Sequence, residues 1–165
     1  MTTTENFFES RILRSLSPFR ERTQSPQLDG LRKRIVGELI GDADAVAETL
    51  DPAFELVMHS GDSTFILAGS AIVDGVRATA AAGVLIWLEL DDLVIDGETI
   101  AGYGAMLTLQ TTQRTVGTAP LGLFLRFREG RMISEVVFVG AATETEVAAV
   151  DIPSIDELRS HLVNS

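Results

Sequence analysis

The second half of the chain consists of strand-like segments that follow one another directly, and this order limits the possible folds more than any other feature. The segments are residues 84–95, 100–111, 120–128 and 132–139. Turn residues separate them, namely Asp96-Gly97, a loop that contains Gly117, and Glu129-Gly130. Consecutive hairpins leave no crossover helices to cover a parallel sheet, so the pattern predicts an antiparallel sheet.

Helices are expected mainly before this sheet. Ser25, followed by proline, can cap a helix whose leucines and isoleucine recur every three or four residues until Gly41 ends it. Asp42 can cap a second helix, which ends before Pro52 because the residue before a proline avoids the helical region. Short strands are predicted at residues 54–59 and 64–67, and a third helix at residues 70–82.

Helices followed by a β-meander predict an α+β fold, in which a curved antiparallel sheet forms a cone and the N-terminal helices cover one face. We expect three parts: a basic arm with a short helix at residues 1–24, the cone-shaped domain at 25–142, and an acidic linker with a C-terminal helix at 143–165. Small-molecule pockets commonly form where such a sheet meets its helices.

Composition excludes several function classes. The 165 residues carry a net charge of −11 and no cysteine, which excludes thiol nucleophiles and cysteine-based metal sites and argues against a nucleic-acid partner. No stretch reaches the roughly 18 apolar residues of a membrane span, and the N-terminus shows no signal-peptide pattern. We therefore expect a cytoplasmic protein with no membrane or nucleic-acid partner, no metal and no cofactor.

Several segments resemble the nuclear-transport-factor-2-like superfamily. They are Leu50-Asp51-Pro52 before an extended segment ending at His59, Gly69 leading into AIVDGV at 71–76, LVIDGETIA at 93–101, and LFLRFREGRMI at 123–133. The resemblance covers residues 28–140 and includes polyketide cyclases, ketosteroid isomerases and limonene-epoxide hydrolases. It implies an α+β roll with an apolar cavity, a small hydrophobic ligand, and a homodimer formed through the sheet.

The catalytic patterns of these branches are missing from the chain. There is one tyrosine, the strand at 132–139 carries neither histidine nor aspartate, and no Asp-Arg-Asp relay is recognisable. The resemblance therefore transfers no catalytic residue, and candidates have to come from the chain itself.

Four residues are candidates for acid–base chemistry: His59, Tyr103, Asp91 and Glu135. His59 ends an apolar strand and is either a general base or a strand-end side chain with a local partner. Tyr103, between two glycines that indicate a bend, is either an oxyanion donor or a buried phenol with a backbone partner. Glu135 is either a lone acid in an apolar setting or an exposed residue of the sheet.

Strand alternation places Trp87, Glu89 and Asp91 on one face, which lines the cone or faces water. Trp87, Glu89, Met106 and Phe124 are the predicted ligand-binding residues. Two functions remain open at this point. One is non-catalytic, either binding of a small hydrophobic ligand or a dimeric accessory role. The other is a small-molecule isomerase, cyclase or epoxide hydrolase that uses acid–base catalysis in an apolar pocket.

Overall fold

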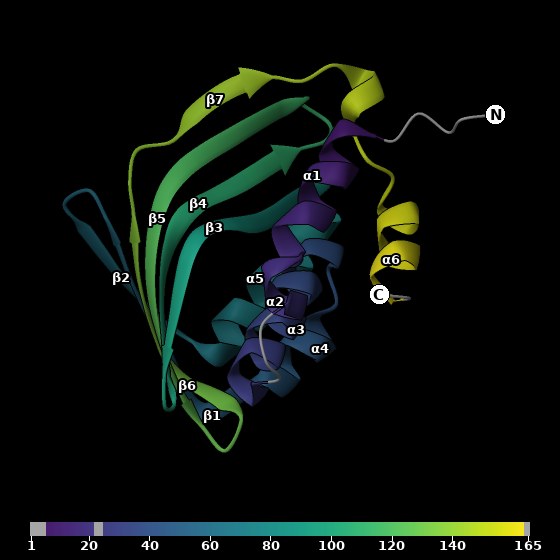
Figure 1. Ribbon diagram of the computed structural model, residues 1–165. Coiled ribbons are helices and arrows are strands. Elements are labelled where there is room, and N and C mark those ends of the chain that lie inside the picture. Colours follow the sequence, from purple (N-terminus) through teal and green to yellow (C-terminus); the bar gives the residue numbers. More distant parts are fainter. Residues whose placement is uncertain (1–5, 22–24, 164–165) are drawn as a thin grey trace.

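The computed structural model describes residues 6–21 and 25–163, and shows one curved sheet wrapped around a group of helices (Figure 1). Residues 1–5 and 22–24 of the predicted arm, and 164–165 of the predicted tail, lie outside the described residues. The helices are α1 (Phe7–Leu16), α2 (Pro18–Glu21), α3 (Pro26–Ile40), α4 (Ala43–Thr49), α5 (Gly69–Ala81), the 3₁₀ turn η1 (Ala149–Asp151) and α6 (Ile155–Val163). The strands are β1 (Leu50–Ser60), β2 (Ser63–Ala68), β3 (Val84–Asp96), β4 (Thr99–Gln110), β5 (Thr115–Arg128), β6 (Arg131–Val139) and β7 (Thr143–Glu146). None of the described helices is long and apolar enough to cross a membrane.

The sheet is mixed, and its strand order is β2-β1-β6-β5-β4-β3, with β7 paired to β5. The predicted α+β fold with a curved sheet is confirmed, and the consecutive strands from β3 to β6 pair antiparallel as expected. The prediction of a purely antiparallel sheet is wrong at one place, because β1 runs parallel to β6. After β1 the chain forms β2, α5 and then the consecutive strands β3 to β6. The last of these, β6, pairs with β1 and runs in the same direction.

The helix boundaries follow the predicted capping residues. The Ser25 hydroxyl accepts a hydrogen bond from the Leu28 backbone N–H at 3.4 Å. Gly41 ends α3 in the left-handed conformation, with φ of 74°, where glycine lacks the steric penalty of a side chain. The Asp42 carboxylate then accepts from the Ala45 N–H at 3.0 Å and starts α4.

Three strands differ from the sequence prediction. β1 begins at Leu50 rather than at residue 54 and includes Pro52, in a stretch where the pairing with β6 is irregular and a missing N–H costs little. β5 begins at Thr115 rather than at residue 120. The acidic segment after β6 contains β7, which pairs with the start of β5. The additional strand residues gain their pairing from backbone hydrogen bonds to neighbouring strands, which propensity and alternation do not report.

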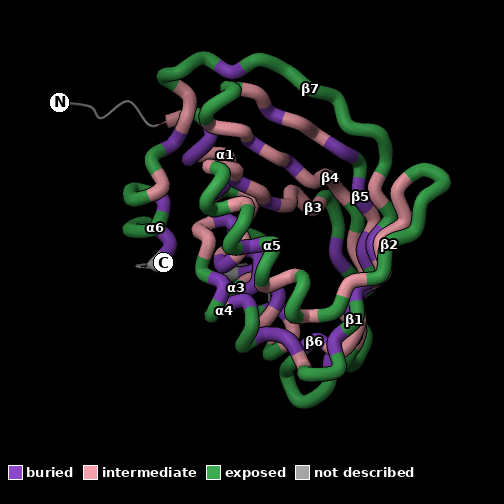
Figure 2. The backbone as a smooth tube through the Cα atoms, turned by 180° about the vertical axis from the view of Figure 1, so that it is seen from behind, coloured by how far each residue is buried: buried purple, intermediate pink, exposed green. Residues whose placement is uncertain are grey.

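The core lies between the helices and the concave face of the sheet. Leu28, Ile35, Leu125 and Met132 are almost completely buried there. Figure 2 shows the contrast with α5, which is largely exposed, and with β7, which is exposed throughout. The helical layer therefore packs against the sheet mainly through α3, and α5 lies on the solvent-exposed side of this layer.

A β-bulge in β3 decides which side chains face the helices. The pairing of β3 with β4 shifts between Leu90 and Asp92, so that Asp91 is the extra residue. The bulged backbone comes so close to β4 that a Cβ atom on Gly104 would lie 2.0 Å from the Glu89 carbonyl oxygen. Glycine at position 104 is thus a requirement of the bulge.

We predict that Gly104→Ala destabilises the fold by about 1–3 kcal/mol or more, because the added methyl group collides with backbone that can only move by distorting the bulge. Gly122→Ala is the matched control, since a Cβ there meets nothing within 4 Å. The measurement is the free energy of unfolding in urea for both variants. Equal stability of the two variants would contradict the assignment of the bulge.

Candidate functional site

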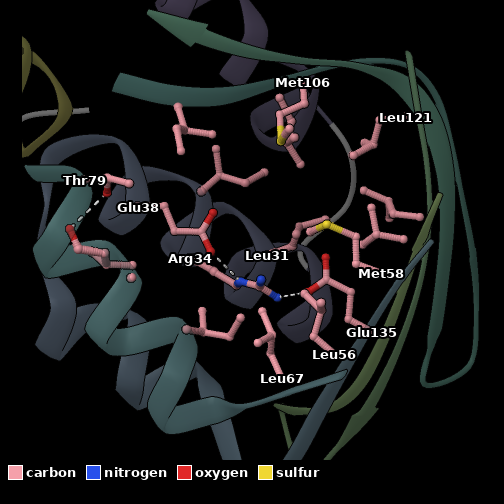
Figure 3. Close-up of a pocket in the computed structure, with 18 of the residues that line it drawn as sticks. Leu31, Arg34, Glu38, Leu56, Met58, Leu67, Thr79, Met106, Leu121 and Glu135 are labelled. Atoms are coloured by element: carbon pink, nitrogen blue, oxygen red, sulfur yellow. Dashed lines mark hydrogen bonds and ion pairs between the residues drawn. The ribbon is translucent and has the colours of Figure 1, made fainter. Parts of the chain in front are cut away.

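A cavity of about 270 Å³ lies between α3, α5 and the inner face of the sheet (Figure 3). Most of its wall is aliphatic or thioether side chain, including Met58, Met106 and Leu121. The polar side chains that line it are Arg34, Glu38, Thr79 and Glu135. A concave, mainly apolar site with a few convergent polar groups is the usual form of a small-molecule site, and the volume of this cavity lies just below the common range of about 300–1,000 Å³.

Two elements supply the charged groups. Arg34 and Glu38 lie one helical turn apart on α3, on the same side of the helix. Glu135 comes from β6, where it lies in register between Leu56 of β1 and Leu125 of β5. Since alternate residues of a strand share a face, Glu135 and Val137 point toward the helices while Val136 and Phe138 point away.

The three charged groups form one network. The Arg34 guanidinium donates from Nε to Glu38 Oε1 at 2.9 Å, and from Nη1 to Glu135 Oε2. The same Nη1 lies 3.4 Å from the Met132 sulfur, and the guanidinium carbon lies 5.5 Å from the centre of the Phe54 ring. Arg34 is 6% exposed and Glu135 is 7% exposed, so this ion pair is cut off from bulk water.

Burial and charge shift the proton equilibria of this network. Burial alone lowers the pKa of the Arg34 guanidinium, but the neighbouring carboxylates of Glu135 and Glu38 together raise that pKa above its ordinary value, so Arg34 stays charged. Burial also raises the pKa of the Glu135 carboxyl, against the opposing effect of Arg34. Glu135 is therefore a carboxyl group that binds a proton more readily than an exposed glutamate.

Three predicted site residues lie on the outer face of the sheet, away from the cavity. The strand register places His59 beside Phe138, Phe138 beside Gly122, and Gly122 beside Tyr103. The His59 ring stacks on Phe138 with centroids 4.8 Å apart, and its Nδ1 lies 3.1 Å from the Thr64 hydroxyl oxygen. Tyr103 and Phe124 are 58% and 45% exposed.

Trp87, Glu89 and Asp91 also lie outside the cavity lining. The Trp87 ring is buried against Phe8 of α1, with centroids 6.2 Å apart. The Glu89 carboxylate is paired with Arg11 of α1, at 2.5 and 2.9 Å. Asp91 is exposed at the bulge. The face of β3 that carries Trp87 and Glu89 thus holds the N-terminal helix, while Ile86 and Leu88 on the opposite face line the cavity.

Of the eight predicted site residues, the structure therefore brings Met106 and Glu135 to the cavity. Sequence reasoning missed Arg34 and Glu38, which are the partners of Glu135. A signal was present, because Arg34 and Glu38 form an i,i+4 pair of opposite charge within the predicted helix. In the part of the chain that the structure describes, no group of three or more histidine, aspartate or glutamate side chains is placed to hold a metal.

No protein-family model matches the sequence, and no curated protein sequence matches it either. Solved structures do match the fold. An LEH-like epoxide hydrolase from M. tuberculosis superposes with a TM-score of 0.57 at 13% identity, over 69% of this chain and 82% of that one. A hypothetical protein with a ketosteroid isomerase-like fold, from Catenulispora acidiphila, gives 0.54 at 14% identity, over 77% and 95%.

A third similar structure is an NTF2-like protein of unknown function from Burkholderia pseudomallei, with a TM-score of 0.54 at 17% identity, over 69% of this chain and 90% of that one. At these identities the likeness concerns the fold and carries no activity with it. The curved sheet, the helices packed inside it and these superpositions agree, and the chain has the fold of the nuclear-transport-factor-2-like superfamily.

Proposed function

We propose that this protein binds a small, mainly hydrophobic molecule in the cavity between α3, α5 and the sheet. The observation that carries the proposal is the cavity itself, an apolar space with a buried charged network on one wall. An apolar molecule in this space would remove the aliphatic and thioether wall from contact with water, which is favourable, and the network offers it a fixed polar anchor.

The test is binding of cyclohexylmethanol, followed by saturation-transfer NMR, to the protein and to Met106→Trp. The larger indole fills space into which Met106 projects (Figure 3), so we expect binding to weaken by at least about tenfold. Tyr103→Trp, on the exposed outer face, is the matched control and keeps normal binding. Met106→Phe is a milder variant if the tryptophan unfolds the protein. Unchanged binding by a folded Met106 variant would rule out this cavity as the site.

Proton transfer by Glu135 is a second candidate function. Its support is the buried carboxyl in the cavity wall, whose pKa is raised by burial, so that it releases its proton at a higher pH than an exposed glutamate does. Among the similar structures, one is named an LEH-like epoxide hydrolase, which is a small-molecule activity of that protein, and another is described only by its ketosteroid isomerase-like fold.

We expect the protein to accelerate exchange of the α-hydrogens of cyclohexanone in deuterium oxide, measured by proton NMR, and Glu135→Gln to abolish the acceleration. Only the ionised carboxylate accepts a proton, so the rate should fall as the pH drops through the raised pKa of Glu135, above the usual value of about 4.3. Glu48→Gln, at an exposed position outside the cavity, serves as the control. Exchange no faster than in buffer would remove this candidate.

We also propose that a second copy of the chain covers the outer aromatic patch, defined as His59, Tyr103, Phe124 and Phe138. These side chains occupy neighbouring rows of the sheet, and Phe138 is 58% exposed. Contiguous exposed aromatic surface indicates an interface, and two identical patches can meet around a two-fold axis. A dimer formed through this patch would leave the inner cavity unobstructed.

Phe138→Glu should convert the dimer to a monomer, because it would bury a carboxylate in the apolar contact. Phe65→Glu is the control, since Phe65 is similarly exposed but pairs with Met58, which lines the inner cavity. The molar mass is measured by light scattering after size exclusion. A monomeric unmodified protein, or a Phe138→Glu variant that remains dimeric, would contradict the proposal.

A further inference from the structure

The charged wall of the cavity is unbalanced. Its ionisable residues are Arg34, Glu38 and Glu135, and the remaining lining side chains are apolar apart from Thr79. Two carboxyl groups thus face one guanidinium, which leaves one net negative charge when both are ionised. In surroundings of low dielectric constant, a nearby positive charge is worth more than in water.

Arg34 uses only one oxygen of each carboxylate. Glu38 accepts through Oε1 and Glu135 through Oε2. Their other oxygens accept no hydrogen bond from the described residues, although an ionised carboxylate has room for several donors. The Glu38 side chain is 27% exposed and that of Glu135 is 9% exposed, so Glu38 is the more accessible acceptor from within the cavity.

Resting on the pocket-binding function proposed above, we propose that the ligand is a small hydrophobic amine, whose ammonium group pairs with Glu38 and whose hydrocarbon part lies against Met106 and Leu121. Figure 3 shows Glu38 on one side of the cavity and these two apolar side chains across from Arg34. The Thr79 hydroxyl donates to the Val76 carbonyl at 3.1 Å, so its oxygen is still able to accept an N–H from the same ammonium group.

Other ligand charges fit this wall less well. Arg34 donates from Nε and Nη1 to the two glutamates, and a carboxylate that accepted from its remaining N–H groups would place a third negative charge beside Glu38 and Glu135. A neutral alcohol would form hydrogen bonds but leave the net charge uncompensated. Burial raises the pKa of the Glu135 carboxyl, Arg34 opposes that shift, and the nearby Glu38 carboxylate adds to it.

The experiment compares ligands that differ only in charge on one hydrocarbon skeleton. Cyclohexylmethylamine, cyclohexylmethanol and cyclohexanecarboxylate are titrated into the full-length protein by calorimetry near pH 7, where an alkylamine is protonated. The phenyl and hexyl analogues are run in parallel to allow for shape. We expect the amine to bind at least about tenfold more tightly than the alcohol, and the carboxylate to bind most weakly.

Glu38→Gln tests the contact itself. It removes the charge while Arg34 keeps Glu135 as its partner, so amine affinity should fall to that of the alcohol and alcohol affinity should stay within about twofold. Glu48→Gln, whose carboxylate pairs with Lys33 outside the cavity, should leave both affinities unchanged. An effect of Glu38→Gln on the amine that is no larger than its effect on the alcohol would overturn the assignment of Glu38.

Different results would contradict the pocket-binding function and the preference for an amine. If the alcohols bind and the amines bind no better, the pocket-binding function stands and the amine preference is wrong. If the carboxylates bind most tightly, Arg34 rather than Glu38 selects the ligand, which also overturns the inference. If none of the skeletons binds in any charge form, the pocket-binding function falls, and the amine preference falls with it.

Discussion

The ion pair between Arg34 and Glu135 is the interaction on which the inner architecture depends. An unpaired charge in this position would cost several kcal/mol, and removing one partner of such a pair typically costs about 3–5 kcal/mol. Arg34 therefore ties α3 to β6 at one position, with the Phe54 ring on its face and Glu38 as a second partner. The same contact places the polar end of the cavity beside its apolar wall. Arg34, Glu38 and Glu135 therefore both hold the inner structure together and provide the polar groups available to a ligand.

The sheet separates two kinds of surface. Around the cavity, residues of β1, β4, β5 and β6 alternate between the inner and the outer face, which places Met58 and Glu135 inside but His59 and Phe138 outside. In β3 the bulge at Asp91 interrupts this alternation. Consequently Leu88 and Leu93 both face inward although their positions differ in parity. Ligand binding and association with a second copy can therefore take place on opposite faces without competing for residues.

Much of the fold was predictable because its signals are local. The Ser25 cap, the left-handed Gly41 and the turns at Gly97 and Gly130 act within a few residues of their own position, and the structure places elements there as expected. β7 was missed because it is held by pairing with the start of β5, and the first residues of β5 pair with both β4 and β7, contacts that composition does not encode. Gly104 indicated a bend in the sheet, but the sequence did not show that the extra residue would lie in the paired strand β3 rather than in β4.

The sequence by itself determined the order of the main helices and long strands, and the presence of an acid among apolar residues at Glu135. It did not determine which face of each strand would be covered, because an alternating pattern has two faces and only packing chooses between them. The tertiary structure assigned Trp87 and Glu89 to α1, turned Tyr103 outward, and brought Arg34 to a carboxylate 101 residues away in the chain. Contacts at that separation are set by how the sheet closes over α3, and no local pattern carries that information.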